Sequence, residues 1–183
     1  TERPYEQLSC LFNVLAVMGT AMGSRGGATG AFGPVLVSSW SDYDAVGGHA
    51  AVHADIVEDL ALARNFRDAG LPVEVLEGGH DVRFRMYPGG LRQLVEGWTK
   101  NFAVGAGSTR LLRLAAIVLW VTCLGSAVFS LEDALRGELP LLTGVTLYLA
   151  FVAQLAVMFR QVGSFGVLTA LVYPVALLFF VAV

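Results

Sequence analysis

The chain has 183 residues, of which 55% are hydrophobic and only 15% are charged, and its mean hydropathy is +0.64. Such a composition lies outside the usual range of soluble proteins and indicates a protein bound to a membrane. The formal net charge is -3, and lysine and arginine form no cluster, which excludes nucleic acid as a partner because its phosphates require a basic face.

The first predicted element is a helix over residues 5–22, where apolar side chains recur at helical spacing and few side chains are strongly polar. Two placements remain open for this helix: the core of a folded domain or the interface of a bilayer. The glycine-rich residues 23–33 lack the lysine and the hydroxyl residue of a phosphate-binding loop. We therefore expect an irregular loop there.

The next stretch combines a strand, a capped helix and a glycine turn. Residues 34–39 predict a short strand. Ser41 is expected to cap a helix with Asp42 and Asp44 in its first turn. The adjacent glycines at 47–48 allow the backbone to approach either a neighbouring helix or a ligand closely.

The clearest predicted helix covers residues 56–69, where apolar and charged residues alternate at helical spacing until Gly70 and Pro72 stop it. Alternating apolar residues then predict two more strands, at 73–76 and 82–86. A final helix, which carries apolar residues from Leu91 to Phe102, leads towards the membrane. The sequence before the membrane zone therefore predicts a mixed α/β region.

Three uncharged runs follow, at residues 114–131, 139–159 and 161–183. A helix needs about 20 apolar residues to cross the hydrocarbon core. The spans that we expect cover about 112–131, 139–159 and 162–183. The alternative, a helical hairpin buried in a soluble core, would carry polar stripes, whereas these runs have only scattered polar residues. Pro174 is expected to kink the third span.

The short flanking segments set the expected orientation, because basic residues favour the cytoplasmic side. Basic residues lie before the first span, at Lys100, Arg110 and Arg113, and between the second and third spans, at Arg160. The loop between the first two spans is mainly acidic. We therefore expect an integral, multi-pass protein of the cell membrane with residues 1–110 in the cytoplasm and the C-terminus outside.

The start of the chain carries a further expectation. It begins at Thr1 without a methionine, and its first residues lack the basic stretch, apolar core and small-residue cleavage site that are typical of a signal peptide. A region of about 105 residues before the first span is small for a complete enzyme domain. We therefore expect an additional N-terminal part.

Glu58 and Asp59 are the first candidates for chemistry. Acidic residues in the first turn of a helix are favoured by the helix dipole, which explains the pair without any function. A carboxylate at a helix start beside a glycine-lined approach can also act as a general base. The helix pattern alone leaves both interpretations open.

Metal binding is a weaker hypothesis. His49 and His53 stand four residues apart, and His80 could add a third ligand, but such histidines are more often surface or packing residues. Asp42 and Asp44 match a D-x-D metal motif, although helix capping explains them more simply. We expect no metal ligand in this chain.

Two arginines are candidates for binding an anion. Arg83 and Arg85 point to the same face of a predicted strand. They could contact an anion, lie exposed in solvent, or pair with Glu74 or Glu77.

Several short motifs, taken in their order and spacing, resemble the C-terminal half of a family 2 membrane glycosyltransferase. The chain is similar in particular to the branch that glycosylates carotenoid acids or other lipids. The resemblance covers nearly all of residues 32–110 and fits the spans that follow. The motifs are Tyr43-Asp44-Ala45-Val46-Gly47-Gly48-His49, Ile56-Val57-Glu58-Asp59, Val82-Arg83-Phe84-Arg85-Met86-Tyr87 and Gly97-Trp98-Thr99-Lys100-Asn101.

The resemblance implies a GT-A fold and the inverting transfer of a sugar from a nucleotide-sugar donor to a lipid acceptor. It implies that Asp59 is the catalytic base that deprotonates the acceptor and that Glu58 supports it. Gly47 and Gly48 would lie beside the acceptor or the donor sugar.

On the donor side, the resemblance implies that Trp98 takes the place of the tryptophan in the family's Q-x-x-R-W pattern. The sequence departs from that pattern, because no arginine precedes Trp98. The contact with the donor pyrophosphate is therefore expected from Lys100 or Arg85, or it is lost.

The resemblance also implies a domain organisation. Residues 1–108 would be the acceptor-side half of an α/β GT-A domain, and residues 109–183 a transmembrane region. A divalent metal, Mg²⁺ or Mn²⁺, is expected for the complete enzyme, with its ligands and the nucleotide-binding strands outside this chain. We expect this fragment to be inactive alone. The alternative is a non-catalytic integral membrane protein, either truncated or an accessory subunit.

Overall fold

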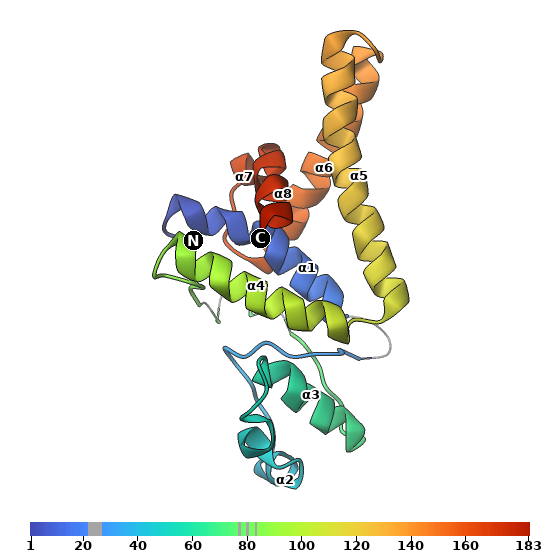
Figure 1. Ribbon diagram of the computed structural model, residues 1–183. Coiled ribbons are helices and arrows are strands. Elements are labelled where there is room, and N and C mark those ends of the chain that lie inside the picture. The colour runs from blue at the N-terminus through green and yellow to red at the C-terminus, as the bar shows by residue number, and fades with distance from the viewer. Residues whose placement is uncertain (22–26, 77, 80, 83) are drawn as a thin grey trace. The chain divides into compact units, whose positions relative to one another are not determined.

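The computed structural model describes residues 1–21, 27–76, 78–79, 81–82 and 84–183. The regular elements of this part of the chain are helices (Figure 1). In chain order they are η1 (Pro4–Ser9), α1 (Cys10–Thr20), α2 (Trp40–Ala45), η2 (Gly48–Val52), α3 (Glu58–Asp68), α4 (Leu91–Ser108), α5 (Leu111–Arg136), α6 (Leu141–Val162), α7 (Val167–Leu171) and α8 (Tyr173–Ala182), where η marks a 3-10 helix.

The predicted α/β GT-A domain is wrong for this structure, because the described residues form no strand and no sheet. The segments 34–39 and 73–76 are irregular, and so are the described residues of 82–86. A strand is stabilised by hydrogen bonds to a neighbouring strand, and an alternating sequence does not supply that neighbour. Apolar side chains of these segments accordingly remain in solvent, with Val37 93% exposed and Leu76 80% exposed.

The described residues divide into two compact units. The first unit comprises Thr1–Leu15, Arg85–Trp98 and Arg110–Val183, and the second comprises Ala16–Phe84 and Thr99–Thr109. The chain changes unit four times, within α1, before Arg85, within α4 and before Arg110.

The core of the first unit is aromatic. The ring of Phe12 stacks on Trp98 with 5.0 Å between centroids, and its edge contacts Phe179 and Phe180. Cys10 is fully buried, and the other apolar residues between Leu11 and Leu15 are nearly so. The predicted helix over residues 5–22 therefore forms as η1 and α1, and the α1 residues of this unit occupy a protein core.

Helices α5 and α6 are long and apolar enough to cross a bilayer, judged by length and composition. They pack against each other as a hairpin (Figure 1). Only 11% of the most apolar 18-residue stretch of α5 and 17% of that of α6 are buried. The core helix of a soluble protein would be mostly buried. This outward-facing apolar surface supports the first two predicted spans.

The turn between these helices is tight. Gly137 adopts a left-handed conformation with φ of 82°, and the N–H of Glu138 donates to the carbonyl of Asp133 at 2.9 Å. Three residues into α6, Gly144 lies directly against α5, where an added Cβ would be 2.6 Å from the carbonyl oxygen of Ser130. Glycine is therefore required for this close approach of the two helices.

The third predicted span is wrong, because the region 162–183 contains two short helices, α7 and α8, in place of one long helix. Pro174 has no N–H to donate to the carbonyl of Ala170, and its ring clashes with that carbonyl in a continuous helix. The ten residues of α8 extend about 15 Å, roughly half of a hydrocarbon core. The helix instead packs on η1, and the nearby Thr169 hydroxyl donates to Gln7 Oε1 at 2.5 Å.

In the second unit, a small apolar cluster joins α2, η2 and α3. Val52, Ala61 and Leu62 are its buried residues, and Tyr43, Val46 and Phe66 pack against them. The N-cap of α2 is Ser39 rather than the predicted Ser41, since its hydroxyl accepts from the N–H of Asp42 at 3.1 Å.

The predicted helix over residues 56–69 is confirmed as α3 (Glu58–Asp68). It ends as expected at Gly70, which has a left-handed φ of 77°. The N–H of Leu71 donates to the carbonyl of Phe66, and the N–H of Gly70 donates to that of Arg67, which completes a Schellman motif. The C-terminal end of α3 is thereby capped at the position that the sequence predicts.

Candidate functional site

Asp59 lies in the first turn of α3, and backbone N–H groups bind both oxygens of its carboxylate. Oδ2 accepts from the N–H of Gly33 at 2.7 Å, and Oδ1 accepts from the N–H of Leu60 at 2.9 Å. The side chain is half-buried, whereas the neighbouring Glu58 is exposed. The structure thus separates the two members of the acidic pair and orients only Asp59.

The pKa of Asp59 is raised above its ordinary value, mainly because burial disfavours the charged carboxylate. The hydrogen bonds from Gly33 and Leu60 lower this pKa, while the charge of Glu58 raises it. A carboxylate with a raised pKa is a better proton acceptor at neutral pH than an exposed one. The environment of Asp59 is therefore suited to a general base.

The glycine pair forms a turn over the ring of Tyr43. Gly47 and Gly48 have φ of 78° and 51°, which other residues rarely adopt. A Cβ on Gly48 would lie 2.5 Å from the ring of Tyr43. The Tyr43 hydroxyl contacts His49 Nδ1 at 2.7 Å and accepts from the His49 N–H at 2.9 Å. The partner that approaches this backbone closely is thus a side chain of the same unit.

The structure brings the glycine turn and the helix of Asp59 into one cluster. Tyr43, which lies under Gly48, packs against the buried residues that α3 contributes. Contacts between η2 and α3 tie these segments together. Whether the glycines contact a sugar stays a prediction.

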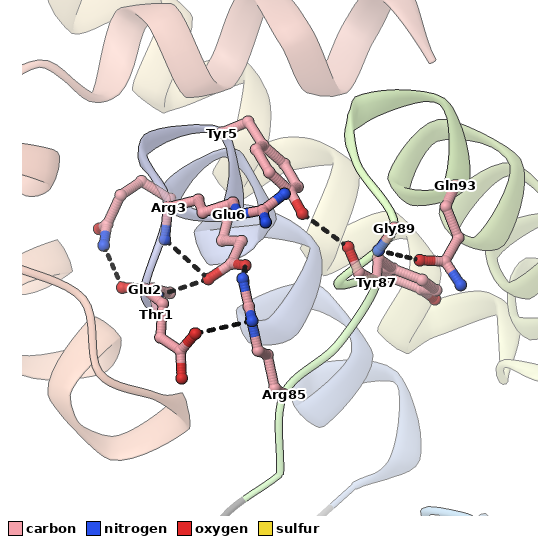
Figure 2. A network of polar contacts seen from close by, with 10 residues as sticks. Thr1, Glu2, Arg3, Tyr5, Glu6, Arg85, Tyr87, Gly89 and Gln93 are labelled. Carbon is pink, nitrogen blue, oxygen red and sulfur yellow. Dashed lines mark hydrogen bonds and ion pairs between the residues drawn. The ribbon is translucent and has the colours of Figure 1, made fainter.

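Arg85 is held by two carboxylates of the N-terminal segment (Figure 2). Its Nε and Nη2 donate to Glu6 Oε1 at 2.8 and 2.5 Å, and its Nη1 lies 2.6 Å from Glu2 Oε2. These partners differ from the Glu74 and Glu77 considered from the sequence, and Glu77, like Arg83, lies outside the described residues. A pyrophosphate contact of Arg85 stays a prediction, and such a contact would compete with this ion pair.

Trp98 is enclosed within the first unit, with 3% of the residue exposed. Its Nε1 donates to the hydroxyl of Ser9 at 3.0 Å, and its ring packs between Phe12 and Tyr87. The ring is therefore part of the protein core of this unit. Lys100 belongs to the second unit and is exposed. The donor-side roles of Trp98 and Lys100 stay predictions.

The weaker metal hypotheses gain no support from the described residues. His53 Nδ1 contacts the carbonyl of Ala50 at 2.8 Å. His80 lies outside the described residues, and elsewhere no three His, Cys, Asp or Glu side chains are grouped to hold a metal ion. Asp42 lies in the capped first turn of α2, as the capping explanation expected.

Sequence reasoning missed two residues that shape these environments. Gly33 was part of a featureless glycine-rich stretch, and its bond to Asp59 spans 26 residues. Glu6 was only one polar residue on an apolar helix, yet it is buried and binds Arg85, 79 residues away. A buried charged residue needs a partner, so the isolated Glu6 on an apolar face was the available signal.

Comparison with known proteins places the chain beside carotenoid glycosyltransferases. It is 37% identical over 185 aligned positions to the 4,4'-diaponeurosporenoate glycosyltransferases of Staphylococcus aureus strains MRSA252 and USA300. The match covers 98% of this chain and 49% of each relative, so the chain spans about half the length of the curated relatives it matches. No family model matches the chain, and no solved structure matches it. The predicted resemblance to the carotenoid-acid glycosyltransferases is confirmed over nearly the whole chain.

Proposed function

We propose that the protein is part of a family 2 membrane glycosyltransferase that transfers a sugar from a nucleotide-sugar donor to a lipid acceptor. The likeness to the Staphylococcus aureus enzymes over 98% of the chain carries this proposal. Their name specifies a carotenoid acid, and we infer an acceptor of the same class: a long apolar molecule with a carboxyl group at its end.

Asp59 is the general base of the proposed reaction. Burial at a membrane surface raises the pKa of a lipid carboxyl group, so the acceptor arrives with its proton. Asp59 accepts this proton while the acceptor oxygen bonds to the anomeric carbon of the sugar. The bond from that carbon to the donor phosphate breaks, and the nucleoside diphosphate leaves. Attack from the opposite face inverts the configuration.

The remaining predicted residues have subordinate roles in this proposal. Glu58 raises the proton affinity of Asp59 through its charge. Gly47 and Gly48 form the turn beside which the acceptor or the sugar binds. Trp98 supports the donor side through the packing of its segment, and Lys100 is an exposed cation that contacts the pyrophosphate.

A divalent metal is expected for the complete enzyme, but the described residues do not fit one. They contain no group of three potential ligands, and Asp42 lies in a helix turn capped by Ser39. No step of the proposed reaction is therefore assigned to a metal held by this chain.

The proposal is tested with Asp59→Asn in membranes that contain the protein expressed from its complete reading frame. Labelled UDP-glucose, UDP-galactose and GDP-mannose serve as donors, and 4,4'-diaponeurosporenoate serves as acceptor. Asparagine can still accept the Gly33 N–H but cannot take a proton, so we expect transfer to fall at least about 100-fold.

Glu58→Gln is the matched control, because it changes the adjacent exposed carboxylate. It should reduce transfer much less than Asp59→Asn. Unchanged transfer in Asp59→Asn would remove Asp59 from its role as the base. Absence of both donor binding and transfer in the unaltered protein would favour the non-catalytic alternative.

A further inference from the structure

The segment that contains Gly33 is held firmly against the start of α3. The Thr29 N–H donates to the carbonyl of Thr20 at 2.7 Å, and Arg67 Nη1 donates to the carbonyl of Thr29 at 3.2 Å. Gly30 packs so closely on the helix that an added Cβ would lie 2.5 Å from Leu60 Cδ2. Gly33 therefore projects its N–H from an anchored segment rather than from a free loop.

The Gly33 N–H completes the orientation of the Asp59 carboxylate. The Leu60 N–H that binds Oδ1 belongs to the same helix turn, so it moves with Asp59. The Gly33 N–H binds Oδ2 from a separate segment and fixes the second oxygen. An added Cβ at Gly33 would lie 3.4 Å from Oδ2, so this contact is close without being crowded.

We propose that Gly33 is a positioning residue of the transfer reaction: its backbone N–H holds the carboxylate of Asp59 in the geometry in which it receives the acceptor proton. This inference rests on the proposed function, in which Asp59 is the base. A hydrogen bond from a neutral donor also favours the ionised carboxylate over the acid. The Gly33 N–H thus lowers the pKa of Asp59, whereas burial and the charge of Glu58 raise it.

The test compares Gly33→Pro, which has no N–H, with Gly33→Ala, which keeps it. The readout is the pH dependence of kcat/KM, because its acid limb reports the ionisation of the base in the free enzyme. In Gly33→Pro the acid limb should move to higher pH, and at a pH on that limb kcat/KM should fall about tenfold relative to the unaltered protein. In Gly33→Ala the acid limb should lie at the same pH as in the unaltered protein.

An unchanged acid limb in a folded Gly33→Pro variant would overturn the inference, because a merely structural role for the N–H does not involve proton affinity. A shifted limb in Gly33→Ala would overturn it as well, because that variant retains the bond. If proline at this position prevents folding, a measurement on the unaltered chain tests the inference instead.

That measurement follows the Gly33 amide by NMR in protein labelled with ¹⁵N-glycine. Its resonance should titrate with the ionisation of Asp59 and stop titrating in Asp59→Asn. A Gly33 amide that shows no titration would overturn the inference. An active Asp59→Asn variant refutes the proposed base itself, whereas an inactive Asp59→Asn with an unaltered limb in Gly33→Pro refutes only the role of Gly33.

Discussion

Glu6 is a buried carboxylate that the chain surrounds with donors. Oε2 accepts the backbone N–H groups of Glu2 and Arg3, and Oε1 accepts two donors from Arg85 (Figure 2). Burial raises the pKa of Glu6, but these hydrogen bonds and the Arg85 charge outweigh burial and lower the pKa to about 2. The folded state therefore favours the ionised form of Glu6 over the protonated form.

The lowered pKa predicts a pH dependence of stability. The unfolded carboxyl titrates near 4.5 and the folded one near 2, so Glu6 stabilises the fold above pH 4.5 and loses that contribution as the pH falls towards 2. The melting temperature of the unaltered protein should exceed that of Glu6→Gln at pH 6, and the difference should vanish near pH 2. Thermal melts followed by circular dichroism in detergent measure this.

Glu96→Gln is the control for that prediction. Glu96 forms an exposed ion pair with Arg92 on α4, and such pairs contribute little. Its melting temperature should follow that of the unaltered protein at every pH. A gap between the unaltered protein and Glu6→Gln that persists unchanged to pH 2 would contradict the assignment.

Individual residues of interest were easier to predict from the sequence than the residues that they contact. Asp59 was identified from a local motif, and its helix position is confirmed. The partners of Arg85 and Trp98 were missed, because Glu6 and Ser9 lie 79 and 89 residues away in the chain. Contacts of this range depend on tertiary folding, which local spacing does not encode.

Helices were predictable as elements because their signals are local. The helical periodicity and the Gly70 stop identified α3, and the uncharged runs identified α5 and α6. The strands failed because pairing requires a second segment, which periodicity does not provide. The third span failed because hydropathy counts residues, whereas Pro174 divides the helix that they would form.

The close approach at Gly144 predicts the sensitivity of the α5–α6 hairpin. Leucine at this position meets the Ala134 Cβ and the Ser130 carbonyl at distances that no side chain tolerates. We expect Gly144→Leu to destabilise the hairpin by about 1–3 kcal/mol through overpacking. Unfolding in mixed detergent micelles, followed by circular dichroism, measures the change.

Gly125→Leu in α5 is the matched control, because an added Cβ there meets nothing within 4 Å. It should leave the unfolding curve nearly unchanged. Equal destabilisation by the two variants would show that the loss of helical glycine, rather than the contact between helices, is responsible.

For the whole molecule, the two long helices predict a topology different from the one expected from sequence. If α5 and α6 are the only spans among the described residues, the segments before α5 and after α6 should lie on the same side of the membrane. The basic residues of the first unit that flank the two helices in sequence, Arg110, Arg113 and Arg160, favour the cytoplasm for that side. The packing of α8 on η1 agrees with this arrangement.

The topology is tested with a protease-cleavable tag after Val183. The tag should be cleaved in inverted membrane vesicles and protected in intact spheroplasts. A tag protected in inverted vesicles and cleaved in spheroplasts would restore the third span. A second tag, inserted beside Glu138 in the short α5–α6 turn, is the control and should show the opposite accessibility.

The burial of Cys10 has a practical consequence for chemical mapping of the protein. Burial raises the pKa of its thiol to about 12, so almost no thiolate exists at neutral pH. Cys123 lies within the apolar run of α5, where lipid would keep water-soluble reagents away. A polar maleimide should therefore leave the native chain unmodified. The labelling of single cysteines introduced at surface positions could then be measured without a signal from Cys10 or Cys123, and neither natural thiol would need to be replaced.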